Sequence, residues 1–135
     1  MKQISGTIYF EQIPKGTSQM KRVNHRSGKF FMGKDLKLAH DLYMNSLFEF
    51  SPERPIEGPV ALGLVFAYSI KDKKKRGTMK TSRPDCDNIV KLVIDVMTEL
   101  GFWVDDAQIC QLRVTKMWSP NESAAISFDV KEVVE

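Results

Sequence analysis

Four aspartates stand at the two borders of one predicted helix. Asp85 and Asp87 lie two residues apart between a basic segment and the helix, and Asp105 and Asp106 come about twenty positions later, before a predicted strand. Hard cations such as Mg²⁺ take several oxygen ligands and retain water molecules, and a ligand set made of aspartates alone suits them better than zinc. If the two pairs converge, they could hold a divalent ion that activates water for phosphodiester hydrolysis.

Each acidic pair also has a purely structural interpretation. Aspartate is a favoured helix N-cap and complements the positive end of the helix dipole, so Asp85 or Asp87 could simply cap the helix. Asp105 and Asp106 could form a polar turn before the strand. Lys91 follows Asp87 by four residues, a spacing that an ordinary charge ladder along a helix would explain. The pattern of residues alone leaves both interpretations open.

The positive charge of the chain is concentrated in two basic segments. Residues 15–34 hold six lysines and arginines and no acid, and residues 71–83 hold seven against Asp72, so each segment carries +6. Because the whole chain carries only +3, the remainder carries −9. This asymmetry indicates a polyanionic partner, although either segment by itself could be a solvated loop. The candidate contacts to nucleic acid are Lys21, Arg22, Arg26, Lys29, Lys73, Lys74, Lys75, Arg76 and Arg83.

The composition is that of a folded protein of ordinary size. The chain has 135 residues, of which 42% are hydrophobic and 27% charged, which is typical of a globular domain. No apolar run approaches the roughly 20 residues that span a bilayer, and the first residues lack the apolar block of a signal peptide. We therefore expect a cytoplasmic protein with no membrane partner. Neither Cys86 nor Cys110 sits in a CxxC pair, and a cytosolic chain of this size does not need a disulfide. We also expect no organic cofactor.

Hydrophobic periodicity predicts the elements that must position the aspartates. Three- and four-residue spacing of apolar residues predicts helices over residues 35–50 and 87–100, the second ended by Gly101. Alternation or continuous apolar character predicts strands over residues 4–10, 60–68, 109–118 and 124–130. The second of these strands is apolar at every position, which predicts a central strand covered on both faces. Residues 15–34 are expected to form a long loop.

The order of these elements predicts the fold class. The sequence β-α-β-α-β-β is typical of an α+β fold, and we expect one domain over residues 1–135, with a mixed β-sheet and two α-helices.

The residues around the second helix form a longer motif. It reads Asp85-x-Asp87-Asn88-x-x-Lys91-x-x-x-Asp95, then Gly101-Phe102-Trp103-x-Asp105-Asp106-x-Gln108-Ile109. This motif resembles the core signature of the RusA family of crossover junction endodeoxyribonucleases. The similar stretch runs from about residue 83 to 117, and the weaker elements before it follow the same order, so the resemblance extends over nearly the whole chain.

The resemblance implies an activity and residue roles. The family consists of homodimeric nucleases that use Mg²⁺ or Mn²⁺ and resolve four-way (Holliday) junctions by paired nicks, in recombination and DNA repair. Its catalytic and metal-binding aspartates fall on Asp85, Asp87 and Asp106, with Asp105 as a further candidate ligand, and its essential lysine falls on Lys91. The basic segments would then bind the backbone of branched DNA. Pro84 departs from some members, which carry a basic residue at that position.

Two other functions remain compatible with the same residues. One is a metal nuclease that cuts other branched DNA, such as flaps or replication forks, and nothing in the sequence excludes it. The other is a non-catalytic DNA-binding module, which would be indifferent to Mg²⁺ and would tolerate the loss of its carboxylates. The acidic set argues against the module, because a protein that only binds DNA has no use for four aspartates near its phosphate site.

Overall fold

A four-stranded mixed sheet forms the base of the structure. The computed structural model describes residues 2–15, 21–23 and 30–134, and side chains for residues 2–15 and 33–134. The strands β1 (Gln3–Phe10), β4 (Val60–Tyr68), β5 (Ile109–Trp118) and β6 (Ala124–Glu132) lie in the order β1-β6-β4-β5. β4 pairs parallel with β5 and antiparallel with β6, which pairs antiparallel with β1.

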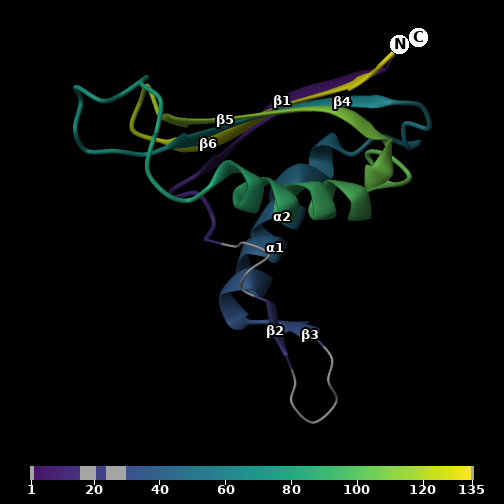
Figure 1. Ribbon diagram of the computed structural model, residues 1–135, viewed down its shortest axis with the longest axis horizontal. Coiled ribbons are helices and arrows are strands. Elements are labelled where there is room, and N and C mark those ends of the chain that lie inside the picture. Colours follow the sequence, from purple (N-terminus) through teal and green to yellow (C-terminus); the bar gives the residue numbers. More distant parts are fainter. Residues whose placement is uncertain (1, 16–20, 24–29, 135) are drawn as a thin grey trace.

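Two helices lie on one face of this sheet (Figure 1). They are α1 (Lys34–Leu47), which the one-turn 3-10 helix η2 (Phe48–Phe50) extends, and α2 (Cys86–Glu99). α1 buries Leu36, Ala39, Tyr43 and Leu47, at the spacing that the sequence predicted. α2 buries a wider stripe, because it packs against α1 as well as the sheet; this stripe is Ile89, Val90, Leu92, Val93, Val96 and Met97. The predicted α+β class, with a mixed sheet and two helices, is confirmed.

The core lies between the helices and the central strands. Every second residue of β4 and β6 points into it, and each of these side chains is at most 3% exposed: Val60, Leu62, Leu64, Phe66, Ala124, Ile126, Phe128 and Val130. The ring of Phe128 makes edge-on contacts with Phe50 and Phe102, at centroid distances of 5.1 and 6.3 Å. This packing fixes the register of the strands, because a slip by one residue would turn the apolar side chains to the other face.

The prediction that β4 is covered on both faces was wrong. No helix of the described residues lies on the second face of the sheet (Figure 1). Of the β4 residues that point to that face, Ala61, Gly63 and Val65 are half-buried, and Ala67, near the end of the strand, is 8% exposed. They are small, and β5 and β6 flank them on either side. Among the described residues, neighbouring strands and not a second layer shield these apolar side chains.

The first basic segment contains a short hairpin where a continuous loop was expected. β2 (Lys21–Val23) pairs antiparallel with β3 (Phe30–Met32), and valine and phenylalanine are residues that favour strands. Of the residues predicted to contact DNA in this segment, Arg26 and Lys29 lie outside the described residues, as do the side chains of Lys21 and Arg22.

The two cysteines do not form a disulfide. Cys86 is half-buried at the start of α2, Cys110 is exposed on β5, and both are free thiols. No helix in the described part of the chain is both long and apolar enough to cross a membrane.

A histidine joins the two helices. Nε2 of His40, on α1, lies 2.9 Å from the carboxylate of Glu99 on α2, and Nδ1 lies 3.3 Å from that of Asp41. Burial opposes protonation, but the hydrogen bonds to the two carboxylates outweigh it and raise the pKa of His40. The folded protein therefore holds this proton more tightly than the unfolded chain. The resulting stabilisation is present below the unfolded pKa of about 6.5 and is lost as the pH rises through the folded pKa.

We predict that His40→Gln removes a pH-dependent contribution to the free energy of unfolding. The contribution should be at most about 1 kcal/mol, because Glu99 is half exposed to solvent. Urea unfolding should show a larger destabilisation at about pH 5.5 than at about pH 9. Lys37→Gln, which removes the exposed ion pair with Asp41, is the matched control and should show little such difference. An equal effect of His40→Gln at both pH values would contradict the prediction.

Candidate active site

The first acidic pair lies at the start of α2. Asp85 is the N-cap residue, with extended backbone (φ −76°, ψ 144°), and Asp87 lies in the first turn. The Asp85 carboxylate accepts no capping hydrogen bond; the N–H groups of Asn88 and Ile89 donate to the Asp85 carbonyl oxygen instead. Both carboxylates are exposed and have no hydrogen bond or ion pair among the described residues. Side-chain capping therefore does not account for them, and they remain available to a ligand.

A lysine of β5 fixes the backbone just before Asp85. Nζ of Lys116 donates to the carbonyl oxygens of Ser82 and Pro84, at 2.6 and 2.7 Å. Hydrogen bonds from a charged donor are among the stronger ones in proteins. The position of the acidic pair is therefore set by the end of β5 as well as by the helix that follows.

A second, buried lysine holds the same segment. Lys80 is 8% exposed, and its Nζ donates to the hydroxyl of Ser82, at 2.6 Å, and to the carbonyl of Arg83. The ammonium also lies 5.2 and 4.6 Å from the ring centroids of Tyr68 and Trp118. Burial, together with the nearby ammonium of Lys116, lowers the pKa of Lys80. Its acceptors and the two aromatic faces compensate for the cost of burying the charge.

Lys91 lies one turn further along α2 than Asp87 and is exposed. Residues four positions apart share one face of a helix, so the ammonium and the Asp87 carboxylate face the same region of solvent. No ion pair joins the two among the described residues. The charge ladder that would have explained their spacing is therefore not formed between them.

The second acidic pair precedes β5, and its two aspartates differ in their hydrogen bonds. The carboxylate of Asp105 accepts a hydrogen bond from the N–H of Ala107, at 2.8 Å, and caps the short helix η3 (Asp106–Gln108). The side chain of Gln108 completes a capping box by accepting from the N–H of Asp105 at 2.9 Å. Asp106 is exposed and has no such partner among the described residues. A structural role in the turn before β5 thus accounts for the carboxylate of Asp105 but not for that of Asp106.

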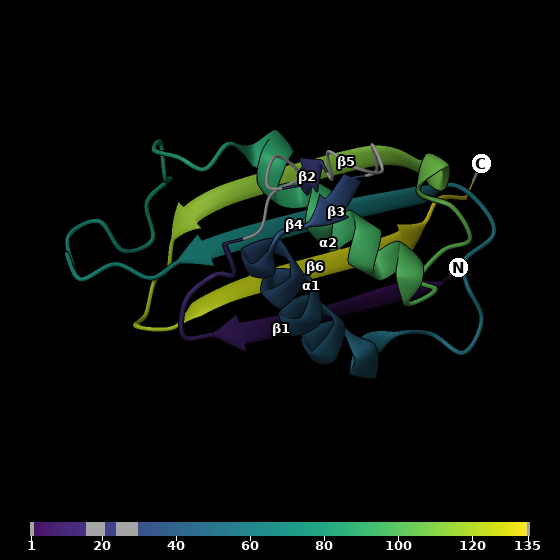
Figure 2. The same cartoon turned by 90° about the horizontal axis from the view of Figure 1, so that it is seen from below.

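The two acidic pairs lie beyond opposite ends of α2, and the length of that helix alone separates them by about 20 Å in one chain. They flank α2, which has 14 residues and is therefore about 21 Å long. They also lie at opposite ends of the sheet: Lys116 holds Pro84 at the end of β5, whereas η3 leads into its start and bonds through Gln108 to Gly58, before β4. Figures 1 and 2 show α2 running along the sheet between these two ends. No three acids, histidines or cysteines of the described residues are placed to hold a metal ion. Convergence of the pairs is not seen within one chain.

The second basic segment projects from the sheet at the end where α2 begins (Figures 1 and 2). Lys73, Lys74 and Lys75 are exposed there, as is Arg83. An antiparallel bridge between Met79 and Met117 joins the segment to β5. Cationic side chains and the Asp85 pair thus share one end of the molecule.

Arg76 differs from its basic neighbours. Its side chain is half-buried, and a guanidinium nitrogen donates to the carbonyl of Ile70 at 3.4 Å. Arg76 therefore contributes to the structure of the second basic segment itself, although it was predicted as a contact to DNA.

The structural roles of Lys80 and Lys116 were missed in the sequence. Lys116 could have been noticed, because strand alternation places it between Val114 and Trp118 on the face that meets the helices, where a lysine is unusual. Lys80 offered no comparable signal, since it stands in a segment rich in lysine and arginine.

Known proteins match the chain across this region. The family model described as Endodeoxyribonuclease RusA matches residues 12–128. The chain is 41% identical over 75 residues to the crossover junction endodeoxyribonuclease rusA of Lactococcus phage r1t, which covers 56% of either chain. It is 29% identical over 146 aligned positions to the uncharacterized protein YqaN of Bacillus subtilis strain 168, covering 98% of this chain and 99% of that one. A third match, 51% identical over 35 residues, is to the crossover junction endodeoxyribonuclease RusA of Escherichia coli K12, covering 26% and 29%. The chain thus spans little more than half of the phage relative.

We predict that Lys80→Met lowers the free energy of unfolding by about 1–3 kcal/mol, because buried acceptors lose their donor. Lys75→Met is the matched control in the same loop; Lys75 is exposed, and its loss should change stability by no more than about 0.5 kcal/mol. Chemical denaturation measures both. Equally small effects would show that Lys80 does not hold the segment before Asp85.

Proposed function

The chain belongs to the RusA family of endodeoxyribonucleases, and on this premise we propose that it is a metal-dependent endonuclease that resolves four-way DNA junctions. The main support for the proposal is the pair Asp85 and Asp87. Both side chains are exposed and have no partner among the described residues. They lie at the same end of the molecule as the exposed second basic segment. Two of the similar proteins are named for crossover junctions. We propose the same substrate here, in recombination and repair in the cytoplasm.

The donor set of the first pair fits a hard divalent cation. Mg²⁺ is commonly held by one or two carboxylates, while water and substrate phosphate complete its coordination. Asp85 and Asp87 supply two carboxylates whose oxygens no described residue occupies. When bound, Mg²⁺ or Mn²⁺ would lower the pKa of a water molecule and neutralise charge on the phosphate. Lys91, on the face of α2 that it shares with Asp87, would donate to an oxygen of the scissile phosphate.

Asp106 would reach this site from a second copy of the chain. The helix between the acidic pairs keeps Asp106 about 20 Å from Asp85 and Asp87 of its own chain. In a two-fold dimer, the partner subunit's Asp106 can lie beside them, and symmetry then forms a second, identical site. Asp105 already serves as a cap, so we assign the third carboxylate to Asp106. Two such sites would account for paired nicks in a substrate with matching two-fold symmetry.

The exposed cations would hold the DNA backbone around the acids. Lys73, Lys74, Lys75 and Arg83 lie at the end where α2 begins. Their contacts to phosphate would release counterions, so we expect binding to weaken steeply as the salt concentration rises. Contacts to phosphate do not by themselves distinguish one base sequence from another. Recognition of the branch would then depend on its shape and on how the two active sites are spaced.

We predict that Asp85→Asn and Asp87→Asn each lower junction cleavage by at least about 100-fold, because a bound metal ion contributes several kcal/mol to the transition state. Binding should persist or tighten, since a negative charge near the phosphate is lost. Nicking of an end-labelled four-way junction with Mg²⁺ and with a chelator, together with a gel-shift assay, measures both effects.

Asp72→Asn is the matched control, because Asp72 is an exposed acid of the basic loop with no role in the proposed site. It should cleave normally. Retained cleavage by both Asp85→Asn and Asp87→Asn would refute the proposed site. Faster cleavage of flaps or forks than of the four-way junction would favour the alternative substrate, and junction binding with no cleavage under any condition would favour a binding module.

A further inference from the structure

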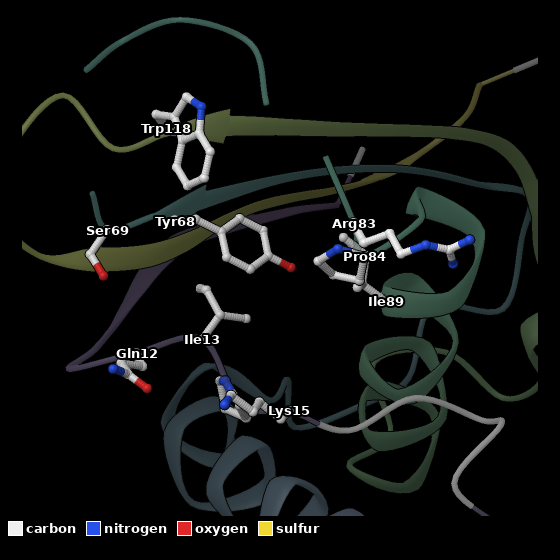
Figure 3. A pocket seen from close by; sticks show the side chains of 10 residues that line it. Gln12, Ile13, Lys15, Tyr68, Ser69, Arg83, Pro84, Ile89 and Trp118 are labelled. Carbon is white, nitrogen blue, oxygen red and sulfur yellow. The ribbon is translucent and has the colours of Figure 1, made fainter. Parts of the chain in front are cut away.

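A cavity of about 510 Å³ opens beside the acidic pair. It lies between the ends of β4 and β5, the segment that leads into α2, and the segment that follows β1 (Figure 3). Its walls are largely apolar and aromatic and include Ile13, Pro14, Tyr68, Pro84, Ile89 and Trp118. The volume falls within the range of pockets that bind small organic ligands. The proposed hydrolysis leaves this cavity without a role.

Cations stand at the margin of the cavity. Lys15 and Arg83 are among the lining residues and are exposed. Figure 3 shows the Arg83 guanidinium turned away from the Tyr68 ring, toward α2. A ligand that combines a flat apolar part with flanking negative charge would match both the walls and the margin.

The cavity wall also holds an unpaired hydrogen-bond donor. The Tyr68 hydroxyl is buried and has no partner among the described residues, and Figure 3 shows it directed toward Pro84 and Ile89. Burial, together with the nearby Cys86, raises the pKa of Tyr68 to about 12, so the hydroxyl keeps its proton at neutral pH. A buried donor without an acceptor is costly. Because protein atoms cover this hydroxyl, a ligand in the cavity would contact the Tyr68 ring and not its oxygen.

The same buried lysine that positions Asp85 also shapes this cavity. The Lys80 ammonium contacts the rings of Tyr68 and Trp118 and donates to the carbonyl of Arg83. The Lys80 ammonium therefore fixes the aromatic wall of the cavity relative to the wall formed by the segment that leads into α2. A site that is already ordered loses less freedom when a ligand binds.

We propose that this cavity receives one unpaired nucleobase of the branched DNA, next to the strand that is cut beside Asp85. The inference rests on the proposed function. Aromatic side chains stack on any base, a base is least costly to extrude where pairing is already disrupted, and Lys15 and Arg83 suit the flanking phosphates. Because Pro84 lines the cavity and directly precedes Asp85, a base held there would set which phosphate meets the acidic pair.

A double-mutant cycle between protein and DNA tests this inference. Affinity is measured in the Asp87→Asn background, with and without Trp118→Leu, for an intact junction and for junctions that each lack one base near the branch. We expect Trp118→Leu to weaken binding about 10-fold to 100-fold. Removal of one particular base should weaken it comparably, and both changes together should weaken it no more than either alone. Tyr9→Leu, at an aromatic residue of β1 that is 68% exposed, is the matched control and should change nothing.

The result that overturns the inference is additivity at every position, or no effect of Trp118→Leu on binding. If Trp118→Leu does not fold, Trp118→Phe, which leaves a smaller ring to stack on, replaces it in the same cycle: coupling to one missing base supports the inference, and no coupling overturns it. Cleavage of the intact junction by the unmodified protein is measured in parallel. If it cuts without coupling, only the cavity inference fails; if it does not cut, the proposed function fails and this inference with it.

Discussion

The parallel pairing of β4 with β5 determines where the two acidic pairs lie. Two consecutive parallel strands require a connection that returns the chain to the end from which the first strand began. Here α2 provides that return, and its 14 residues make it about 21 Å long. A residue before α2 and a residue after it must therefore lie at opposite ends of the sheet. The separation of Asp85 and Asp87 from Asp106 is a direct consequence.

The same pairing gathers the other groups at one end. The carboxyl ends of parallel strands are where ligands bind in many α/β proteins, and here β4 and β5 end at Tyr68 and Trp118. The basic loop leaves the sheet at this end and α2 begins there (Figure 2). The buried ammonium of Lys80 joins the two strand ends to the segment before Asp85. Acids, cations and an aromatic cavity thus meet because one lysine and one strand pair hold them together.

Much of this arrangement could be predicted from the sequence, because burial imposes periodicity on helices and strands. The predicted strands over residues 60–68 and 109–118 coincide with β4 and β5. Two features that depend on long-range packing were not predicted. They are the open face of the sheet beside Ala61 and Val65 and the structural role of Lys80, and neither leaves a local pattern in the sequence. Convergence of the acidic pairs within one chain failed for a different reason. The predicted helix between Asp87 and Asp105 already excluded it, since a straight helix of that length cannot bring its two ends together.

We propose that one active site draws Asp85 and Asp87 from one copy and Asp106 from another, which mixing of inactive subunits can test. An Asp85→Asn/Asp87→Asn double variant and an Asp106→Asn variant should each be inactive on a four-way junction. When the two are co-expressed, mixed dimers contain one complete site. We expect the mixture to regain nicking of a single strand per junction. A mixture that stays as inactive as its two components, although mixed dimers form, would contradict it.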